Sequence, residues 1–521
     1  MADVQKPSLE NGKEKKNVFL VACKAVGHFL TSIGKSIGSF LKKLGLKIGR
    51  AFKNLWQIFV DGSIGTKLSF FFCGSGNLYH KQFFKGFLYL IFQIAFILFM
   101  VLCPEINNTP YGWKALRNLA LMGNPESYVI FRPGELPIKV EKDDSKLLLL
   151  FGLVTIAVVI LYIIVWFSNI KSSYKSDQDV KAGRKPTSFK QDMSSLLDNR
   201  FHFMMLTPTA IAALIFTVIP TIFMICMAFT TYNDFDMNAA LDPYYKNLFH
   251  WNGLTNFLDI FEGSTTLGRE IGARFFPVLG WTMVWAVFAT FTCYFGGILL
   301  AILINKKGIR FKKVFRTVFI LTIAIPQFIS LLAMRNILSG QGPVNQILQN
   351  LGWIDSAIGF LGNNTSGDNP YLAKFMVILI NMWLGIPYTM LMTSGILMNI
   401  PSDLYEAARV DGATKTKMLF KITFPYIIFV TTPYLISSFI GNINSFNTIF
   451  LLTGGGPNVV GGTYVAGETD LLVTWLYKLT ITNGEYNTGA VIGIFTFLIT
   501  ATITLITYRR SKAYKEEDTF Q

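Results

Sequence analysis

The stretch PSDLYEAARVDGATKTKMLFKITFP, residues 401–425, is polar and helix-forming, and it lies between two long apolar runs. Asp403 and Glu406 fall in its first turns, where the positive end of a helix dipole favours acidic side chains. Ser402 can cap the start of this helix, and Gly412 supplies the permissive backbone that ends it. The stretch therefore predicts a short helix, followed by a second helix that leads into the next apolar run.

The composition of the first of these helices suits a docking element. Ala407 and Ala408 are small enough to let the surface of another protein approach. The spacing from Glu406 through Gly412 resembles E-A-A-x3-G-x9-I-x-L-P, the EAA loop of bacterial ABC importers, with Phe424 in the leucine position. The alternative is an ordinary amphipathic helix pair between two spans. The resemblance implies that a separate ATPase docks on Glu406, Ala407, Ala408, Asp411 and Gly412.

Apolar residues are too abundant for a soluble protein of this length. Of the 521 residues, 51% are hydrophobic and 47 are phenylalanine, and the mean hydropathy is positive. The chain is therefore predicted to be an all-α integral membrane protein. The net charge of +16 gathers at the ends of apolar runs, so it indicates membrane topology and no nucleic-acid partner. Five cysteines without a C-x-x-C spacing support neither a zinc site nor a disulfide framework.

Eight apolar runs are long enough to cross a bilayer, which takes about 20 residues per helix. The segments 168–202 and 305–317 carry seven and six Lys or Arg residues, whereas 231–274 carries three against six acids. The positive-inside rule then places both termini and the 401–425 loop in the cytoplasm. Prolines inside the runs, among them Pro326, predict kinks. The predicted spans are 86–103, 147–167, 203–230, 276–304, 318–334, 375–398, 426–446 and 488–507.

A basic segment precedes the first span. From Val26 to Leu55, apolar residues that include Phe52 recur every three or four positions, and lysines lie off that stripe. This pattern predicts a cationic amphipathic helix on the lipid of the cytoplasmic leaflet, with packing on the protein itself as the alternative. The predicted segments are a disordered tail (1–17), this membrane-surface region (18–83), accessory helices one and two (84–202), helix three with an extracellular loop (203–274), a permease core (275–510) and a cytoplasmic tail (511–521).

Motifs for catalysis and for nucleotide binding are missing from the sequence. The four histidines have no metal-binding spacing, and residues 62–67, GSIGTK, lack the spacing of a phosphate-binding P-loop. Asp234 and Asp236 form a D-x-D that a glycosyltransferase could use with a metal and a nucleotide sugar, but the charge count places it outside the cell. The chain is therefore predicted to be a transport subunit and not an enzyme, with no metal or cofactor of its own.

Aromatic and amide side chains take the place of charges in the sixth and seventh spans. Asn381, Trp383 and Tyr388 lie in the sixth, and Ser438 and Asn442 lie in the seventh. Aromatic faces and neutral hydrogen-bonding groups suit a sugar. A proton- or sodium-coupled carrier is expected to hold ionisable groups near the membrane midplane instead. The alternative role for the amides and hydroxyls is helix packing.

Two further segments extend the resemblance, LLTGGGP at 451–457 and AGETDLLVTWLYKL at 466–479. With the EAA loop, they resemble the larger permease subunit of bacterial maltose and maltodextrin importers, which implies a type I ABC importer core in the cell membrane. The resemblance also implies a second permease subunit, two copies of a cytoplasmic ATPase that binds ATP and Mg²⁺, and an extracellular sugar-binding protein or lipoprotein. The substrate positions that it implies are Leu384, Gly385, Tyr388, Ser438 and Asn442, and the chemistry of the sixth span adds Asn381.

Two departures from the maltose relative leave the glycan open. Gly441 stands where that relative has an aromatic ring, and Ser445 stands where it has an asparagine. The expected function is therefore import of a malto-oligosaccharide or a related oligosaccharide, with galacto- or raffinose-type oligosaccharides as the alternative. A membrane glycosyltransferase and a secondary carrier or channel are the competing classes of function.

Overall fold

The computed structural model divides the chain into two units. Unit 1 comprises Met1–Glu105, Tyr111–Leu116 and Val154–Ala213, and unit 2 comprises Ile106–Pro110, Arg117–Leu153 and Leu214–Gln521. The residues that the structure describes are 38–39, 42–43, 45–47, 49–102, 111–122, 129–130, 138–139, 144–198, 201–233, 249–306, 308, 310–362, 369–459 and 464–510. The aspartates of the D-x-D motif therefore lie outside the described residues.

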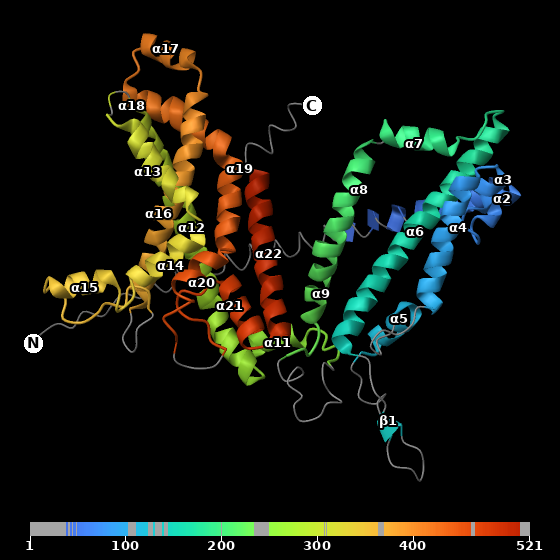
Figure 1. The fold of residues 1–521 in the computed structure, drawn as a ribbon, viewed down its shortest axis with the longest axis horizontal. Coiled ribbons are helices and arrows are strands. Elements are labelled where there is room, and N and C mark those ends of the chain that lie inside the picture. The colour runs from blue at the N-terminus through green and yellow to red at the C-terminus, as the bar shows by residue number, and fades with distance from the viewer. Residues whose placement is uncertain are drawn as a thin grey trace, which may run out of the picture. The chain divides into compact units, whose positions relative to one another are not determined.

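Unit 1 is helical wherever it has regular secondary structure among the described residues. A helix over 49–61 leads into the short helices α2 and α3, and two long apolar helices follow (Figure 1). Trp166 and Asn169 lie on the longer of these two, α6. Trp166 donates its indole N–H to the carbonyl of Phe70, and Asn169 donates to the carbonyl of Ser69 at 3.0 Å. The α2–α3 segment is thereby fastened to α6. The elements are α2 (Ile64–Leu68), α3 (Ser75–Tyr79), α4 (Phe83–Ile97), η1 (Leu98–Leu102), α5 (Gly112–Ala120, which continues into unit 2), α6 (Ser145–Lys181, which begins in unit 2), α7 (Phe189–Leu197) and α8 (Phe201–Ala213).

Unit 2 holds the long helices that carry the candidate site. Two strands of two residues each, β1 (Val129–Ile130) and β2 (Ile138–Lys139), pair in antiparallel register and are a small departure from the all-α expectation. The helices are η3 (Leu214–Val218), α9 (Ile219–Met227), α11 (Thr255–Glu262), α12 (Thr266–Asn305), α13 (Lys312–Ala324), α14 (Gln327–Ile337), α15 (Pro343–Asn350), α16 (Pro370–Met398), α17 (Ser402–Val410), α18 (Lys415–Met418), η5 (Leu419–Thr423), α19 (Phe424–Ile443), α20 (Phe446–Leu452), α21 (Leu472–Tyr477), η6 (Lys478–Thr482) and α22 (Tyr486–Arg510).

Helix α12 is the central element of unit 2, and it packs on both α16 and α19. Its Trp285 is fully buried in a cluster with Leu331, Val377 and Ile449. Glycine allows the helices to approach closely, since a Cβ at Gly297 would lie 2.4 Å from the Cβ of Thr389. Small residues at helix contacts are typical of membrane proteins, where close van der Waals packing holds helices together.

The eight predicted spans are found in a modified form. Among the described residues, seven helices have the length and apolar character needed to cross a membrane. The predicted fifth span is two helices, α13 and α14, bent by 94° at Pro326, and the pair makes an eighth span if it is counted as one. Pro326 has no N–H to donate, so a helix ends readily at this position. The predicted kink is therefore a full break.

Candidate functional site

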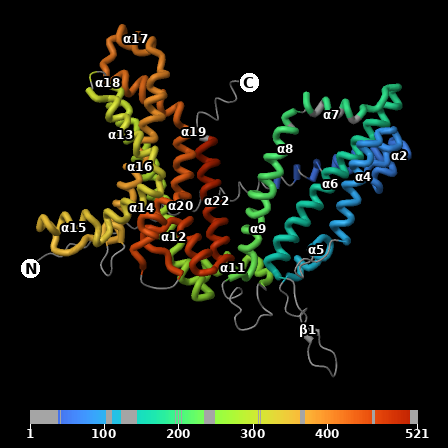
Figure 2. The backbone as a smooth tube through the Cα atoms, in the orientation of Figure 1, coloured from blue at the N-terminus to red at the C-terminus, as the bar shows by residue number. Residues whose placement is uncertain are grey.

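Helix α17 forms the polar loop between the sixth and seventh predicted spans. The tube in Figure 2 leaves the end of α16, turns through α17 and returns into α19, at the end of unit 2 opposite α20 and α21. Pro401 occupies the N-cap position, whereas Ser402 is already helical, so the predicted cap by Ser402 is wrong. Asp403 in the first turn and Arg409 in the last turn both match the helix dipole.

The end of α17 has the glycine termination that the sequence predicts. Gly412 has a φ of +72°, in the left-handed region that favours glycine. Its N–H donates to the carbonyl of Arg409 at 3.0 Å, and the N–H of Ala413 donates to Ala408 at 2.8 Å. These two bonds form a Schellman motif. The helix therefore stops at a defined residue and presents a fixed outer surface.

The outer surface of α17 is exposed and partly apolar. Val410 is 88% exposed and Leu404 is 46% exposed. The exposed residues of the predicted coupling set are Glu406, Ala407, Asp411 and Gly412, whereas Ala408 is half-buried. Apolar side chains exposed beside an acid on a short helix with a defined C-terminus are suited to a protein partner.

A hydrogen bond joins α17 to the helix that follows it. The hydroxyls of Tyr405 and Thr423 lie 2.8 Å apart. Thr414 caps α18 by accepting from the N–H of Lys417, and α18, η5 and α19 then run on as one 29-residue candidate span. Helix α17 is therefore linked, through this contact and a short turn, to the continuous helix that carries Ser438 and Asn442.

Helices α16 and α19 carry the six predicted substrate residues, but most of these side chains contact other helices. Asn381 donates to the sulfur of Cys293 on α12 at 3.5 Å, and a Cβ at Gly385 would lie 2.5 Å from that sulfur. Leu384 packs against the Trp285 cluster. Asn442 donates to Thr290 of α12. These four residues form packing contacts between helices.

Tyr388 and Ser438 are placed differently from the other four. Tyr388 is 54% exposed, and its ring centroid lies 5.9 Å from that of Tyr434 on α19. The hydroxyl of Tyr434 lies 3.4 Å from Thr389. Ser438, one turn beyond Tyr434, is half-buried. The sequence argument did not select Tyr434, although its spacing of four from Ser438 on one helix could have indicated it.

Open space surrounds the position that departs from the maltose relative. Gly441 is exposed, and nothing lies within 4 Å of a Cβ built on it. Its backbone is that of an ordinary α-helix, within α19. The structure can therefore hold a larger side chain at this position, about two turns beyond Tyr434 on α19.

An ion-pair cluster braces the other end of unit 2. Glu468 accepts from Lys374 at 2.8 Å and from Arg274 at 3.1 Å, so the starts of α16 and α12 are joined through the loop before α21. Lys374 also lies 5.2 Å from the ring centroid of Trp281. Burial raises the pKa of Glu468, but the hydrogen bonds and charges of Lys374 and Arg274 outweigh it and hold that pKa below its ordinary value.

Comparisons with known proteins agree with this architecture. Residues 294–512 match the model of the family described as binding-protein-dependent transport system inner membrane component. The chain is 34% identical over 453 residues to the maltodextrin transport system permease protein MalC of Streptococcus pneumoniae, covering 85% of this chain and 95% of that protein. It is 32% identical over 445 residues to the galactooligosaccharides transport system permease protein GanP of Bacillus subtilis. That match covers 85% of this chain and 96% of GanP.

A solved structure of a bacterial ABC transporter involved in the import of the acidic polysaccharide alginate is also similar. That chain is 24% identical to this one, with a TM-score of 0.46. The match covers 62% of this chain and 98% of that chain. The extent and identity of the match to MalC establish the family. The chain belongs to the family of binding-protein-dependent transport system inner membrane components, as a multi-pass permease of the bacterial cell membrane and not an enzyme.

Proposed function

We propose that this chain is the permease subunit of an ATP-driven importer for a malto-oligosaccharide or a related oligosaccharide. An extracellular binding protein or lipoprotein delivers the sugar, and a second permease subunit completes the pathway. Two copies of a cytoplasmic ATPase bind ATP and Mg²⁺, so this chain needs no cofactor or metal. The partners of its outer surface are these proteins and membrane lipid, and nucleic acid is not among them.

The observation that carries the coupling role is the exposed, rigidly ended helix α17. Its apolar and acidic outer surface is available to a partner, whereas Tyr405 holds its inner side to Thr423. Because α18 continues into α19, closure of an ATPase dimer would move the helix that bears Ser438. This arrangement requires α17 to lie in the cytoplasm, with both termini on the same side, as the distribution of Lys and Arg predicts.

The tyrosine pair and Ser438 support the sugar assignment. Tyr388 offers an exposed ring for a sugar face, and hydroxyls of Tyr434 and Ser438 offer hydrogen bonds. Uncharged side chains of this kind suit an uncharged ligand. MalC and GanP, by name, serve maltodextrins and galactooligosaccharides, so a galactooligosaccharide is the second candidate substrate.

The test is ATPase activity of the co-purified complex in nanodiscs, measured with its binding protein and a panel of glycans. The panel contains maltose, maltotriose, longer maltodextrins, raffinose and galactooligosaccharides. Stimulation by maltodextrins alone supports the main proposal, and stimulation by galactooligosaccharides alone supports the second candidate. If the complex assembles and no sugar stimulates hydrolysis, the sugar assignment is wrong.

Coupling is tested separately with a charge reversal on α17. Glu406→Lys is expected to leave assembly intact but to separate ATP hydrolysis from uptake, because the docking surface changes sign. The matched control is Asp355→Lys, the same type of change at an exposed residue outside the 401–425 loop. Equal and normal uptake in both variants would show that α17 does not transmit the signal.

A further inference from the structure

A stripe of large apolar side chains faces outward from the helix over residues 49–61 in unit 1. Phe52 is 69% exposed, Trp56 is 68% exposed and Val60 is 55% exposed. Residues four apart lie on the same face of a helix. Leu55, on another face, is buried, and Phe59 packs edge-on against Phe70 at 5.2 Å. The helix thus has one side on the protein and a second apolar side without a protein neighbour among the described residues.

The sequence placed Phe52 and Leu55 on a single stripe, and the structure separates them. Leu55 faces the protein, whereas Phe52 belongs to the outward stripe with Trp56 and Val60. One face of the helix therefore packs on the protein, as the packing alternative predicts, and the other apolar face is exposed, so the membrane-surface placement stays a prediction. The residues of the predicted stripe before Phe52 all lie outside the described residues.

Basic residues accompany the outward stripe. Between positions 42 and 61 the sequence has five basic residues and one acid, Asp61. All five basic side chains are exposed, and they are Lys42, Lys43, Lys47, Arg50 and Lys53. Apolar side chains next to a basic face are the pattern of helices that lie in the interface of an anionic bilayer.

The chain beyond this helix also exposes apolar side chains up to the first span. Ile64 is 71% exposed, Phe71 is 69% exposed and Phe72 is 62% exposed. Phe83 and Phe84, which open α4, are each 60% exposed. Soluble surfaces rarely expose apolar patches of this extent. Phe83 and Phe84 open α4, which is itself a candidate span, so this exposed apolar surface continues into a predicted membrane helix.

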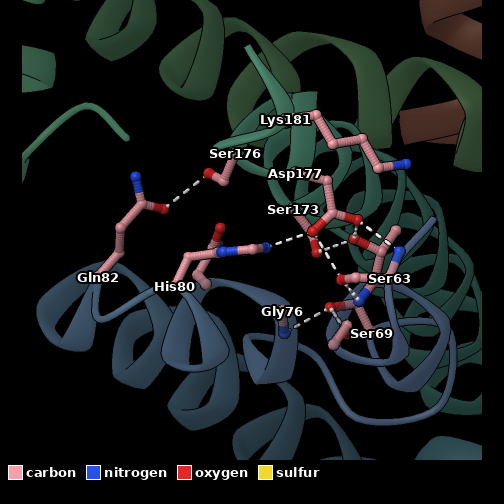
Figure 3. Close-up of polar contacts among 12 residues, drawn as sticks. Ser63, Ser69, Gly76, His80, Gln82, Ser173, Ser176, Asp177 and Lys181 are labelled. Carbon is pink, nitrogen blue, oxygen red and sulfur yellow. Dashed lines mark hydrogen bonds and ion pairs between the residues drawn. The ribbon is translucent and has the colours of Figure 1, made fainter. Parts of the chain in front are cut away.

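A buried carboxylate fastens the end of the helix to α6 (Figure 3). Asp177 has a side chain only 1% exposed. It accepts the backbone N–H of Ser63 at 2.7 Å, the hydroxyl of Ser63 at 2.6 Å and the hydroxyl of Thr66 at 2.5 Å. His80 pairs with the same carboxylate. Ser63 is also the N-cap of α2, so the junction after the helix has one defined geometry.

The last turn of the helix is held by a second bond from α6. Lys181 donates to the backbone carbonyl of Asp61 at 2.8 Å. A cation at the C-terminus of a helix satisfies a free carbonyl and complements the dipole. Asp177 and Lys181, four residues apart on α6, therefore hold both sides of the junction at Gly62.

We propose that helix 49–61 is an anchor that binds anionic phospholipid of the cytoplasmic leaflet. The Phe52, Trp56 and Val60 stripe enters the acyl boundary, and the basic residues from Lys42 to Lys53 contact the headgroups. Asp177 fixes the anchor to α6, so that lipid binding at the surface is tied to the position of that span. This surface shares no residue with α17 or the tyrosine pair, and the proposal does not rest on the proposed sugar.

The first test measures membrane depth along the helix in the full chain. Spin labels are placed one at a time through Phe52→Cys, Trp56→Cys, Lys53→Cys and Gln57→Cys, in a cysteine-free background that still assembles with its partners. Nanodiscs contain phosphatidylcholine alone or with phosphatidylglycerol. Labels at 52 and 56 are expected to collide more with oxygen, which concentrates in lipid. Labels at 53 and 57 are expected to collide more with a water-soluble nickel chelate. The difference in accessibility between the two pairs of positions is expected to grow with phosphatidylglycerol.

Two outcomes of this measurement would overturn the proposal. Access of the nickel chelate to position 56 would place the stripe in water. Shielding of position 56 from both reagents would place it against a protein partner.

The charge component is tested with a matched pair of variants. Arg50→Glu with Lys53→Glu is expected to abolish the effect of phosphatidylglycerol on the depth at Trp56→Cys. Lys185→Glu with Lys190→Glu makes the same charge change at exposed residues of unit 1 and is expected to keep the effect. An effect that survives in the first variant, or disappears equally in both, contradicts a specific basic anchor.

The role of Asp177 is tested by the distance between labels at Trp56→Cys and Lys171→Cys. The pair is expected to give a narrow distribution in the parent and a broad one in Asp177→Ala. Asp177→Asn keeps the shape of the side chain and is expected to lie between them, which distinguishes loss of the junction from misfolding of the unit. An unchanged distribution in Asp177→Ala would show that the carboxylate does not fix the helix.

Discussion

The side-chain amide of Asn442 donates a hydrogen bond to the hydroxyl of Thr290 at 2.9 Å, which joins α19 to the middle of α12. The main-chain carbonyl of Asn442 also accepts the indole N–H of Trp285 at 3.0 Å. A residue that the sequence assigns to the sugar therefore serves to hold two helices together in this structure. Its two roles are separable, because stability and substrate affinity can be measured independently.

Asn442→Ala is expected to lower stability more than it lowers sugar affinity. Loss of the bond to buried Thr290 should cost about 1–3 kcal/mol, because it leaves a buried hydroxyl without that partner. The melting temperature and the KM for uptake are measured together, with Ser438→Ala as the comparison variant. An unchanged melting temperature with a raised KM for Asn442→Ala would assign its amide to the sugar instead.

Tyr388→Ala is expected to raise the KM for sugar uptake by about 3- to 10-fold, since an aromatic contact contributes about 0.5–1.5 kcal/mol beyond buried area. Tyr388→Phe keeps the ring and should stay close to the parent. Trp383→Ala removes another exposed aromatic side chain from α16 and serves as the control. Equal effects of the two alanine variants would indicate a general loss of packing.

Gly441→Phe is expected to fold, because a side chain at this position meets open space. Its ring would add a stacking face on α19, about two turns beyond Tyr434, and is expected to change the order of affinities across maltose, maltotriose and longer maltodextrins. Binding-stimulated ATPase activity measures that order. Gly297→Ala is the control at a glycine without free space, because its Cβ would meet Thr389. This variant is expected to lower the melting temperature. An unaltered order in Gly441→Phe would remove this position from the sugar site.

The sequence was sufficient to locate the helices and the polar 401–425 loop, because apolar length and glycine termination depend on local residues. Pro326 indicated a kink, but the 94° angle between α13 and α14 depends on how α14 packs in the fold. The direction of side chains within a span was not predictable in the same way. Asn381 and Gly385 are a turn apart on α16, and only the position of Cys293 on a distant segment decides that both face α12.

The basic segment illustrates the same limit. Phe52 and Leu55 both fit a three-to-four spacing, but a spacing cannot tell which of two neighbouring faces the protein covers. The junction after this helix is fixed by Asp177, which accepts from Ser63 across 114 residues of the chain. Long-range hydrogen bonds of this kind leave no periodic signal in the sequence.

The Glu468 cluster is expected to stabilise unit 2 in a pH-dependent way. Since Lys374 and Arg274 hold the folded-state pKa of Glu468 below its unfolded value of about 4.3, the ionised form is favoured by folding. The contribution is therefore complete above the unfolded pKa and is lost as the pH falls through the lower folded pKa. Because the side chain of Glu468 is 27% exposed, solvent screening limits the contribution to about 1–2 kcal/mol.

Glu468→Gln should accordingly lower the melting temperature at pH 7, and the difference from the parent should shrink as the pH is lowered below about 4.5. Melting curves of the purified chain from pH 3.5 to 7 test this, with Glu262→Gln on the exposed end of α11 as the control. The control should differ little from the parent at any pH, because its carboxylate is exposed. A difference for Glu468→Gln that stays constant across this range would show that shape, and not the charge of Glu468, holds α12 and α16 to the loop before α21.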